Sequence, residues 1–418
     1  MQNTKRNLQT DVAVIGAGPA GLSAAVFAAR SGHSVIALDR MPSPGRKLLA
    51  SGGGRCNLAN ALETSALCAS FGEAAKFVRP ALTSFPLSSL LRFFSSLGVE
   101  CSAPDGFHYF PDSNSAREVL DALIGECREL QIQILPNAEV LEICRDAAGY
   151  MLFCEELTIL CRKVVISTGG KSWPSLGSNG GGFRLAASLG HSIVKPVPAL
   201  GGLAVAQPWL GTLAGVVLQS AAIRIRGESK NLARGGELLF THSGLSGPAA
   251  LNACARISRA LEAGEPVEIE ADLLPALSWQ RLSEILIEQA ALSGKRNVTT
   301  LLGELLPASL VTQLAATFGF RNAVLANLSK AMRDSVVKSV KALSLTVTGT
   351  EGFDKAMVTS GGVRLDEVNH KTLESKLHPG LHFAGEVLDV DGPCGGFNLH
   401  WAFASGRLAG MSASASLM

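Results

Sequence analysis

Apolar runs followed by glycine-rich turns shape the first part of the chain. Residues 12–15 form a short apolar run that predicts a buried strand, residues 22–30 predict a helix of small side chains, and residues 34–39 predict a second strand. A further apolar run at 163–166 also ends in a glycine turn. Strands that alternate with helices are typical of a parallel sheet, so the pattern predicts an α/β fold.

The middle of the chain has a different pattern. Residues 201–272 predict mostly strands, as at 221–226, where apolar and basic residues alternate. Residues 274–341 repeat apolar side chains at helical spacing, so we expect a β-rich part that carries a helical part. One face of a predicted helix contains Leu282, Ile285, Leu286 and Ala290.

Residues 197–223 contain no charged side chain and are long enough to span a bilayer. Pro198, Pro208 and four glycines interrupt this stretch, so we interpret it as two or three buried strands joined by turns. We therefore expect no insertion into a membrane.

Composition narrows the class of protein. The 418 residues carry a formal net charge of +2 with scattered Lys and Arg, which argues against a nucleic-acid partner. The polar residues 1–10 lack the apolar core of a secretory signal. Nine cysteines without a C-x-x-C pair fit a reducing, cytoplasmic location, and no Cys/His cluster indicates a metal.

The turn after residues 12–15 has the G-x-G-x-x-G pattern at Gly16, Gly18 and Gly21. In this pattern the first glycine permits a tight turn, the second lets a pyrophosphate approach the backbone, and the third lets helix and strand pack closely. The helix N-terminus then offers unpaired N–H groups to the phosphates. Asp39 ends the second strand 18 residues after Gly21, where a carboxylate accepts the adenosine ribose hydroxyl. This arrangement predicts FAD or NAD rather than NADP.

Three further segments favour noncovalent FAD as the cofactor. Residues 45–57 combine three consecutive glycines with three cations, so their backbone can press against a phosphate or a planar ring. Residues 163–170 predict a strand ending in Thr-Gly-Gly, at the edge where open α/β sheets bind ligands. Residues 381–398 predict a strand, acidic turns and a helix whose N-terminus stabilises negative charge on a reduced flavin. Because there is no second G-x-G-x-x-G, we expect no separate nicotinamide-binding domain.

With these motifs the chain resembles a bacterial family of NAD(P)/FAD-dependent oxidoreductases. That family includes bile-acid dehydro-4,6-reductases and is similar to fumarate-reductase-type flavoproteins. The matching segments are the G-x-G-x-x-G fingerprint at Gly16, Gly18 and Gly21 and residues 45–57, 239–248, 358–363 and 374–398. One departure is residues 178–183, where an acidic residue expected among the glycines is absent.

The resemblance implies a glutathione-reductase-like, Rossmann-like FAD-binding domain that is interrupted by an insertion. In this layout, residues 1–194 and 352–418 form the FAD-binding domain, 195–273 an inserted β-rich subdomain, 274–341 an inserted helical subdomain and 342–351 a return strand.

The expected cofactor contacts come from the fingerprint and from the segments that carry the resemblance. They are Gly16, Gly18, Pro19, Ala20, Gly21, Asp39, Arg40, Arg46, Lys47, Gly53, Gly54, Arg55, Cys56, Asn57, Val140, Thr168, Gly169, Gly170, Gly385, Glu386, Asp391, Gly395, Gly396, Phe397 and Asn398.

For the substrate side we select Arg55, Cys56, His242 and Ser243 as candidate catalytic residues. The resemblance implies that the strand-to-helix turn with His242 faces the flavin domain, where a histidine donates a proton or anchors an anionic substrate. Its alternative role is to cap the helix or to bond a backbone carbonyl. Cys56 beside cationic Arg55 is either a reactive thiol or a small buried filler, and we favour the filler.

His108 and Tyr109 lie in an aromatic segment, residues 106–111. Both are candidates for a substrate pocket. A strand that carries aromatic side chains into the core is the interpretation we prefer.

These motifs predict an FAD-dependent oxidoreductase that takes hydride from NAD(P)H, a transient donor, and reduces an unsaturated small organic molecule. One alternative is an oxidase or dehydrogenase that passes electrons to oxygen or a quinone. An RNA-modifying flavoprotein is a second alternative, against which the near-neutral charge argues. A third is a flavin-binding regulator without turnover. The sequence predicts no particular oligomeric state.

Overall fold

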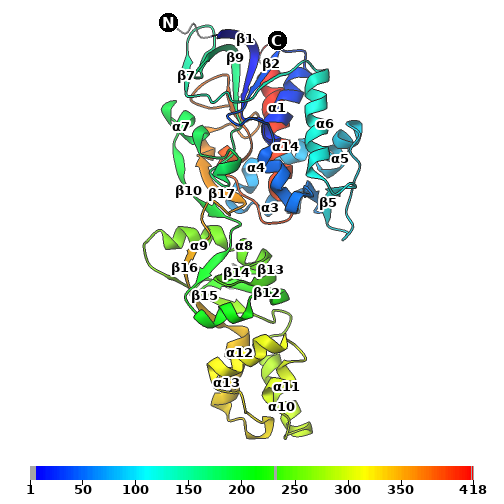
Figure 1. The fold of residues 1–418 in the computed structure, drawn as a ribbon, viewed down its shortest axis with the longest axis vertical. Helices are drawn as coiled ribbons and strands as arrows, with labels where there is room; N and C mark the ends of the chain where they lie inside the picture. Colours follow the sequence, from blue (N-terminus) through cyan, green and yellow to red (C-terminus); the bar gives the residue numbers. More distant parts are fainter. Residues whose placement is uncertain (1–5, 230–232, 416, 418) are drawn as a thin grey trace. The chain divides into compact units, whose positions relative to one another are not determined.

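The computed structural model describes residues 6–229, 233–415 and 417 (Figure 1). Its contacts divide the chain into two units, Met1–Val197 with Val358–Met418 and Pro198–Met357. The first unit holds helices and a sheet that is parallel except for β8 (Tyr150–Phe153) and β7 (Glu142–Arg145), and the second holds a closed barrel and further helices. The predicted α/β architecture with a β-rich and helical insertion is confirmed.

The apolar run at the start of the chain lies at the centre of the sheet of the first unit. Val12, Ala13 and Val14 are fully buried, because parallel strands pair with this strand on both sides. The strands expected at 12–15, 34–39 and 163–166 are therefore confirmed. The strand order is β6 (Gln133–Leu135), β2 (Val35–Leu38), β1 (Arg6–Ile15), β9 (Leu157–Ile166), β8 (Tyr150–Phe153) and β7 (Glu142–Arg145), with β18 (Leu381–Phe383) also paired to β9.

Two helices from opposite ends of the chain pack against each other in this unit. Glycines allow the contact, since a Cβ on Gly406 would lie 2.1 Å from Ala20 O and one on Gly410 would lie 2.2 Å from Ala24 O. These helices are α1 (Pro19–Ala29) and α14 (Phe397–Ala415), blue and red in Figure 1. Other helices of the unit are α2 (Arg46–Ala50), α3 (Thr64–Ala69), α4 (Ala75–Ser84), α5 (Leu87–Ser96), α6 (Ala116–Glu129) and α7 (Gly181–Ser188).

Two small sheets complete the first unit. In the first of them, Asn60 pairs with His108, and in the second a strand from before the insertion pairs with one from after it. They consist of β3 (Ala59–Asn60), β5 (His108–Pro111) and β4 (Cys101–Ser102), and of β10 (Ile193–Ala199) and β17 (Val358–Val363).

The second unit is built on a closed barrel. Every neighbouring pair of its strands is antiparallel, and buried residues such as Ile223 and Ile269 fill its interior. The barrel order is β11 (Leu203–Val205), β14 (Gly244–Ser246), β13 (Arg234–Phe240), β12 (Val217–Ile225), β15 (Val267–Asp272) and β16 (Leu343–Thr350).

The uncharged stretch 197–223 forms strands and a short 3-10 helix, Pro208–Leu213, so the interpretation as buried strands with turns is confirmed. In the part of the chain that the structure describes, no helix has the length and apolar character needed to cross a membrane.

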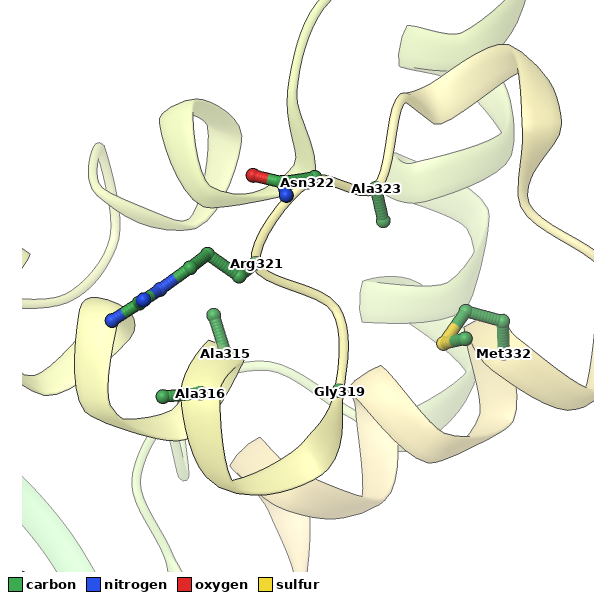
Figure 2. Close-up of a pocket in the computed structure, with 7 residues that line it drawn as sticks. All are labelled: Ala315, Ala316, Gly319, Arg321, Asn322, Ala323 and Met332. Carbon is green, nitrogen blue, oxygen red and sulfur yellow. The ribbon is translucent and has the colours of Figure 1, made fainter.

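Helices between β15 and β16 form the helical part of the second unit. The predicted apolar face is confirmed, because Leu282 and Leu286 are buried while Ile285 and Ala290 pack against the same core. A hollow in this part, shown in Figure 2, is lined by Ala315, Ala316, Gly319, Arg321, Asn322, Ala323 and Met332. The helices are α10 (Trp279–Leu292), α11 (Val298–Leu302), α12 (Ala308–Phe318) and α13 (Lys330–Lys341), with α8 (Pro248–Leu251) and α9 (Cys254–Leu261) preceding them.

Candidate functional site

The three fingerprint glycines have distinct surroundings. A Cβ on Gly21 would lie 1.8 Å from Gly16 O, and one on Gly16 would lie 2.7 Å from Ser167 O, so neither position accepts a side chain. At Gly18 no atom lies within 4 Å of a Cβ, and this residue directly precedes Pro19, the first residue of α1. The turn therefore presents open backbone at a helix N-terminus, which fits an approaching pyrophosphate.

Asp39 is fixed beside this turn at the end of β2. Its Oδ2 accepts from the Ala17 N–H at 2.9 Å and its Oδ1 from the Met41 N–H at 2.8 Å. Burial raises the pKa of Asp39 above its ordinary value. Each carboxylate oxygen retains a lone pair, so the group can also accept from a ribose hydroxyl. The next residue, Arg40, is exposed, and its Nε lies 3.6 Å from Glu139 Oε1 beside buried Val140.

The glycine-rich loop after Asp39 leaves backbone exposed. Gly52, Gly53 and Gly54 have φ angles of 57°, 67° and 87°, a region that favours glycine. Around Gly53 no atom lies within 4 Å of a Cβ, so this position is open to a ligand. Arg46 and Lys47, at the start of α2, are half-buried in front of this loop.

An ion pair joins this loop to the C-terminal motif. Lys47 Nζ lies 2.7 Å from Glu386 Oε2, and Glu386 Oε1 accepts from the Thr359 N–H at 2.8 Å. A Cβ on Gly170 would lie 2.4 Å from Thr359 Oγ1, so the Thr168–Gly169–Gly170 turn after β9 packs against the same group. The structure thus brings together Lys47, the Thr168–Gly170 turn, Thr359 and Glu386, which come from four separate segments of the sequence.

The turn before α14 is also held rigidly. A Cβ on Gly396 would lie 2.5 Å from Ala59 O, and Asn60 Nδ2 donates to Gly395 O at 2.8 Å. Asn398 Oδ1 accepts from the Gly392 N–H at 2.8 Å, which closes the turn. Four further predicted cofactor contacts lie near this turn. Asp391 Oδ1 accepts from Ser360 Oγ at 2.7 Å, and Gly385 packs on Ala20. Phe397 is buried, and the Asn57 amide lies between Ala59 O and Gly396 N.

Arg55 and Cys56 differ sharply in environment. Arg55 is exposed, and its guanidinium carbon lies 4.7 Å from the centre of the Phe110 ring. Cys56 is fully buried, and burial raises the pKa of its thiol to about 12. A thiol with that pKa is not ionised at neutral pH, so this environment suits a packing role.

His242 and Ser243 lie in the second unit. We expected a strand-to-helix turn here, and that expectation is wrong, because the residues occupy the hairpin turn between β13 and β14. The Thr241 N–H donates to Gly244 O at 2.8 Å and closes the turn, which leaves both side chains exposed. Helix α8 begins only at Pro248, after β14, so His242 is not at its cap.

His108 departs from its expected role in packing. The strand is confirmed as β5, but both His108 and Tyr109 are only half-buried, and His108 pairs with Asp105. Sequence reasoning did not select Asp105. The sequence signal that could have indicated this pair is an acidic residue three positions before a histidine, with a glycine between them.

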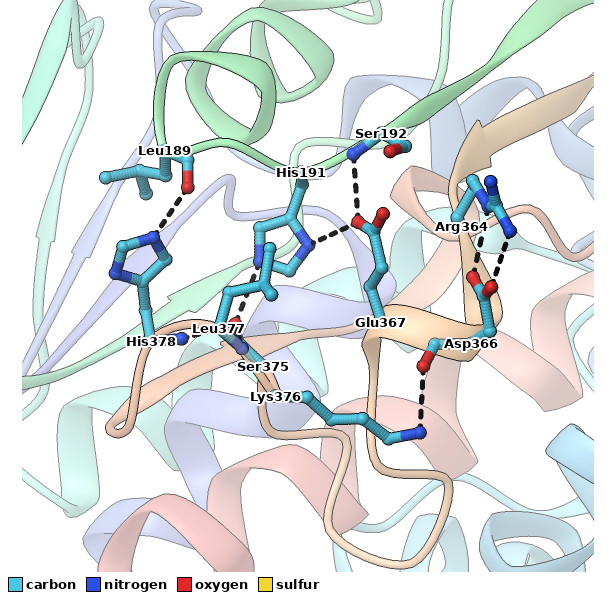
Figure 3. A network of polar contacts seen from close by, with 10 residues as sticks. All are labelled: Leu189, His191, Ser192, Arg364, Asp366, Glu367, Ser375, Lys376, Leu377 and His378. Atoms are coloured by element: carbon cyan, nitrogen blue, oxygen red, sulfur yellow. Dashed lines mark hydrogen bonds and ion pairs between the residues drawn. The ribbon is translucent and has the colours of Figure 1, made fainter.

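His191 is buried and belongs to the network of polar contacts shown in Figure 3. Its Nδ1 lies 3.1 Å from Glu367 Oε2 and its Nε2 lies 2.8 Å from Ser375 Oγ. The carboxylate, imidazole and hydroxyl thus follow one another as they do in a catalytic triad of acid, base and nucleophile. Ser375 Oγ, however, also accepts from the N–H groups of Leu377 and His378 and is buried. We interpret the network as a structural link between the turn after α7 and the loop before β18.

Comparisons with known proteins agree with this architecture. The family model described as HI0933-like protein Rossmann domain matches residues 10–412. A 3-dehydro-bile acid delta(4,6)-reductase of Clostridium scindens is 33% identical over 96% of this chain and 98% of its own length. A ribosomal RNA dihydrouridine synthase of Escherichia coli K12 is 33% identical over 94% of this chain and 96% of its own length.

Among solved structures, the open conformation of a flavocytochrome c3 fumarate reductase has a similar fold. Its TM-score is 0.53 at 19% identity, covering 98% of this chain and 78% of that chain. The resemblance to fumarate-reductase-type flavoproteins is thereby confirmed at the level of the fold. The chain belongs to the HI0933-like family of Rossmann-fold flavoprotein oxidoreductases, with FAD as its cofactor.

Proposed function

We propose that the protein uses electrons from NAD(P)H to reduce a carbon–carbon double bond conjugated to a carbonyl group. The observation that carries this proposal is the pair of relatives at 33% identity over nearly the whole chain. A delta(4,6) bile acid with a 3-keto group and the uracil ring of a uridine both contain such a bond. Reducing either one adds a hydride and a proton across it, so the two named reactions share one chemical step.

The residues present fit FAD, and we propose the following placement. The open backbone at Gly18 and the N-terminus of α1 hold the pyrophosphate, while Asp39 accepts from the adenosine ribose. Lys47, Glu386 and the Thr168–Gly170 turn would hold the part of the cofactor between the pyrophosphate and the flavin ring. Gly395, Gly396 and the N-terminus of α14 would hold the flavin ring, where the helix N-terminus would stabilise negative charge on it. When reduced, the flavin supplies the hydride.

An anaerobic titration with NADH and NADPH, followed by the visible absorbance of the flavin, tests the electron donor. Bleaching by either is expected. The reduced protein is then mixed with a 3-keto-4,6-diene bile acid or with ribosomal RNA, and mass spectrometry measures the gain of two hydrogen atoms. If the flavin stays oxidised with both nicotinamides, the proposal that NAD(P)H is the electron donor is wrong. If neither acceptor is reduced, the proposal that the substrate contains a conjugated double bond is wrong. Rapid peroxide formation with an organic donor favours the oxidase alternative.

An RNA substrate is the second candidate, because of the charge distribution in residues 274–341, which we propose to be a separate helical subdomain. There Lys and Arg outnumber Asp and Glu eight to four. Five cations of this region have no acidic partner among the described residues; four of them lie in its second half, and one of these four, Arg321, borders the hollow of Figure 2. An excess of positive charge in this region suits phosphates even though the charge of the whole chain is near zero. These cations are Lys295, Arg321, Lys330, Arg333 and Lys338.

Replacing unpaired cations distinguishes the two substrates. A triple variant with Arg321→Ser, Lys330→Ser and Lys338→Ser should bind ribosomal RNA at least about tenfold more weakly and reduce the bile-acid dienone at the normal rate. The matched control removes three cations that are already ion-paired, with Arg281→Ser, Arg296→Ser and Lys355→Ser. Equal RNA affinity of the two triple variants contradicts the RNA candidate.

A further inference from the structure

A histidine–carboxylate pair lies at the start of β5, with His108 in the strand and Asp105 in the turn before it. His108 Nδ1 and Asp105 Oδ2 are 2.6 Å apart, and Asp105 Oδ1 accepts from the N–H groups of Phe107 and His108 at 2.9 and 2.8 Å. The hydrogen bond from the His108 side chain, followed by those from the backbone, holds the pKa of Asp105 well below its ordinary value. Because the carboxylate occupies Nδ1, the atom left to exchange a proton is Nε2.

Nε2 points at the turn that precedes α14. A Cβ built on Gly395 would lie 3.1 Å from His108 Nε2. The register of the small sheet explains this proximity, since β3 places Asn60 opposite His108 and Asn60 Nδ2 donates to Gly395 O. Among the described residues Nε2 has no hydrogen-bond partner, and the side chain is 35% exposed. A residue that served only to fill the core would be neither exposed nor paired in this way.

The same face of β5 carries a second candidate residue. His108 and Phe110 are two positions apart, so their side chains lie on one face of the strand, and Tyr109 lies on the other. Arg55 stacks on the Phe110 ring at 4.7 Å. An imidazole and a guanidinium therefore lie on one face beside the glycine turn that we assign to the flavin.

We propose that His108 is the proton donor of the reaction and that Asp105 is its positioning residue. This inference rests on the proposed function. Hydride delivered to the β-carbon pushes the electrons of the double bond onto the carbonyl oxygen as an enolate. The enolate then collapses to the ketone as its α-carbon takes a proton from Nε2 of the imidazolium. The product has gained one hydride and one proton, the flavin is oxidised, NAD(P)H restores it, and water returns a proton to His108.

Rapid mixing of dithionite-reduced holoenzyme with the dienone tests the proton donor without involving the nicotinamide. His108→Gln is expected to slow flavin reoxidation by the acceptor about 100-fold or more, as befits loss of a general acid. Reduction by NAD(P)H and affinity for FAD should stay within about twofold. Tyr109→Phe, on the opposite face of the same strand, is the matched control and should reoxidise normally.

Nitrogen NMR of the histidines supplies a readout that does not depend on turnover. Adding FAD to the apoprotein should shift the His108 Nε2 signal, and Asp105→Asn should change the tautomer of the ring. Unchanged reoxidation in His108→Gln, or a parallel loss of FAD binding that marks a structural role, overturns the inference while the proposed function stands. If the wild-type protein reduces no conjugated acceptor, the proposed function fails and the inference fails with it.

Discussion

The two units of the chain differ in where their functional features reside. In the first unit, glycines such as Gly21 and Gly410 stand where a neighbouring carbonyl leaves no room for a Cβ, and the candidate cofactor contacts are largely backbone groups. In the second unit, the candidate residues are exposed side chains such as His242 and Arg321 on an ordinary barrel and helices. Backbone recognition depends on the exact path of the chain, whereas side-chain recognition depends on charge. Single added atoms at the glycines of the first unit should therefore have the largest effects on FAD binding, and changes to exposed side chains of the second unit should leave FAD binding unchanged.

The largest effect is expected from Gly21→Ala. The added methyl group would lie 1.8 Å from Gly16 O, so strand and helix must separate. We expect the FAD content of the purified protein to fall below about a tenth of normal, with a clear drop in Tm. Gly18→Ala is the control for folding, because its Cβ meets no atom within 4 Å. Its apoprotein should keep the Tm of the wild-type apoprotein and lose only FAD affinity. Normal FAD content in Gly21→Ala would refute the close-packing argument.

Acid should weaken the first unit more than the second. Burial lowers the pKa of His382 to about 4. The nearby Glu374 carboxylate opposes this shift, and the Lys163 ammonium adds to it. An unfolded chain takes up this proton near pH 6.5 and the folded chain does not, so stability is lost as the pH falls from about 6.5 toward 4. From pH 7 to 5 this residue alone removes about 2 kcal/mol.

Urea unfolding at the two pH values measures this loss. His382→Leu should reduce the pH dependence, and His242→Asn, an exposed histidine of the second unit, should leave it unchanged. An identical pH dependence in His382→Leu and the wild type would show that another group is responsible.

A smaller effect is expected from Lys47→Met. The substitution keeps the length of the side chain but leaves Glu386, half-buried at 20% exposure, without its partner at 2.7 Å. We expect FAD affinity to fall about tenfold, roughly 1.4 kcal/mol, as measured by fluorescence titration. Lys355→Met, which removes an exposed ion pair in the second unit, is the control and should have no effect.

The smallest effect concerns a helix cap in the second unit. Ser329 Oγ accepts from the Met332 N–H at 3.1 Å at the start of α13. Ser329→Ala should lower the free energy of unfolding by about 1 kcal/mol, and Ser329→Asp should restore it. FAD binding should not change in either variant. A change in FAD affinity would show that the second unit also affects FAD binding, contrary to the comparison of the two units.

Sequence patterns determined the local features of this protein. The strand–glycine–helix order, the apolar face of α10 and the broken, uncharged stretch 197–223 all depend on neighbouring residues, so periodicity was sufficient to predict them. The glycine spacing and the acid at Asp39 predict a dinucleotide site for the same reason.

Only the tertiary structure decided which distant groups meet. Lys47 pairs with Glu386 across 339 residues, and Asn60 reaches Gly395 across 335. No pattern within either segment encodes these partners, because strand order and register place them together. For the same reason long-range packing buried Cys56 and raised the pKa of its thiol, a hairpin replaced the turn expected at His242, and sheet pairing left His108 beside the glycine turn. Local sequence sets which conformations a segment prefers, and long-range packing sets what each side chain faces.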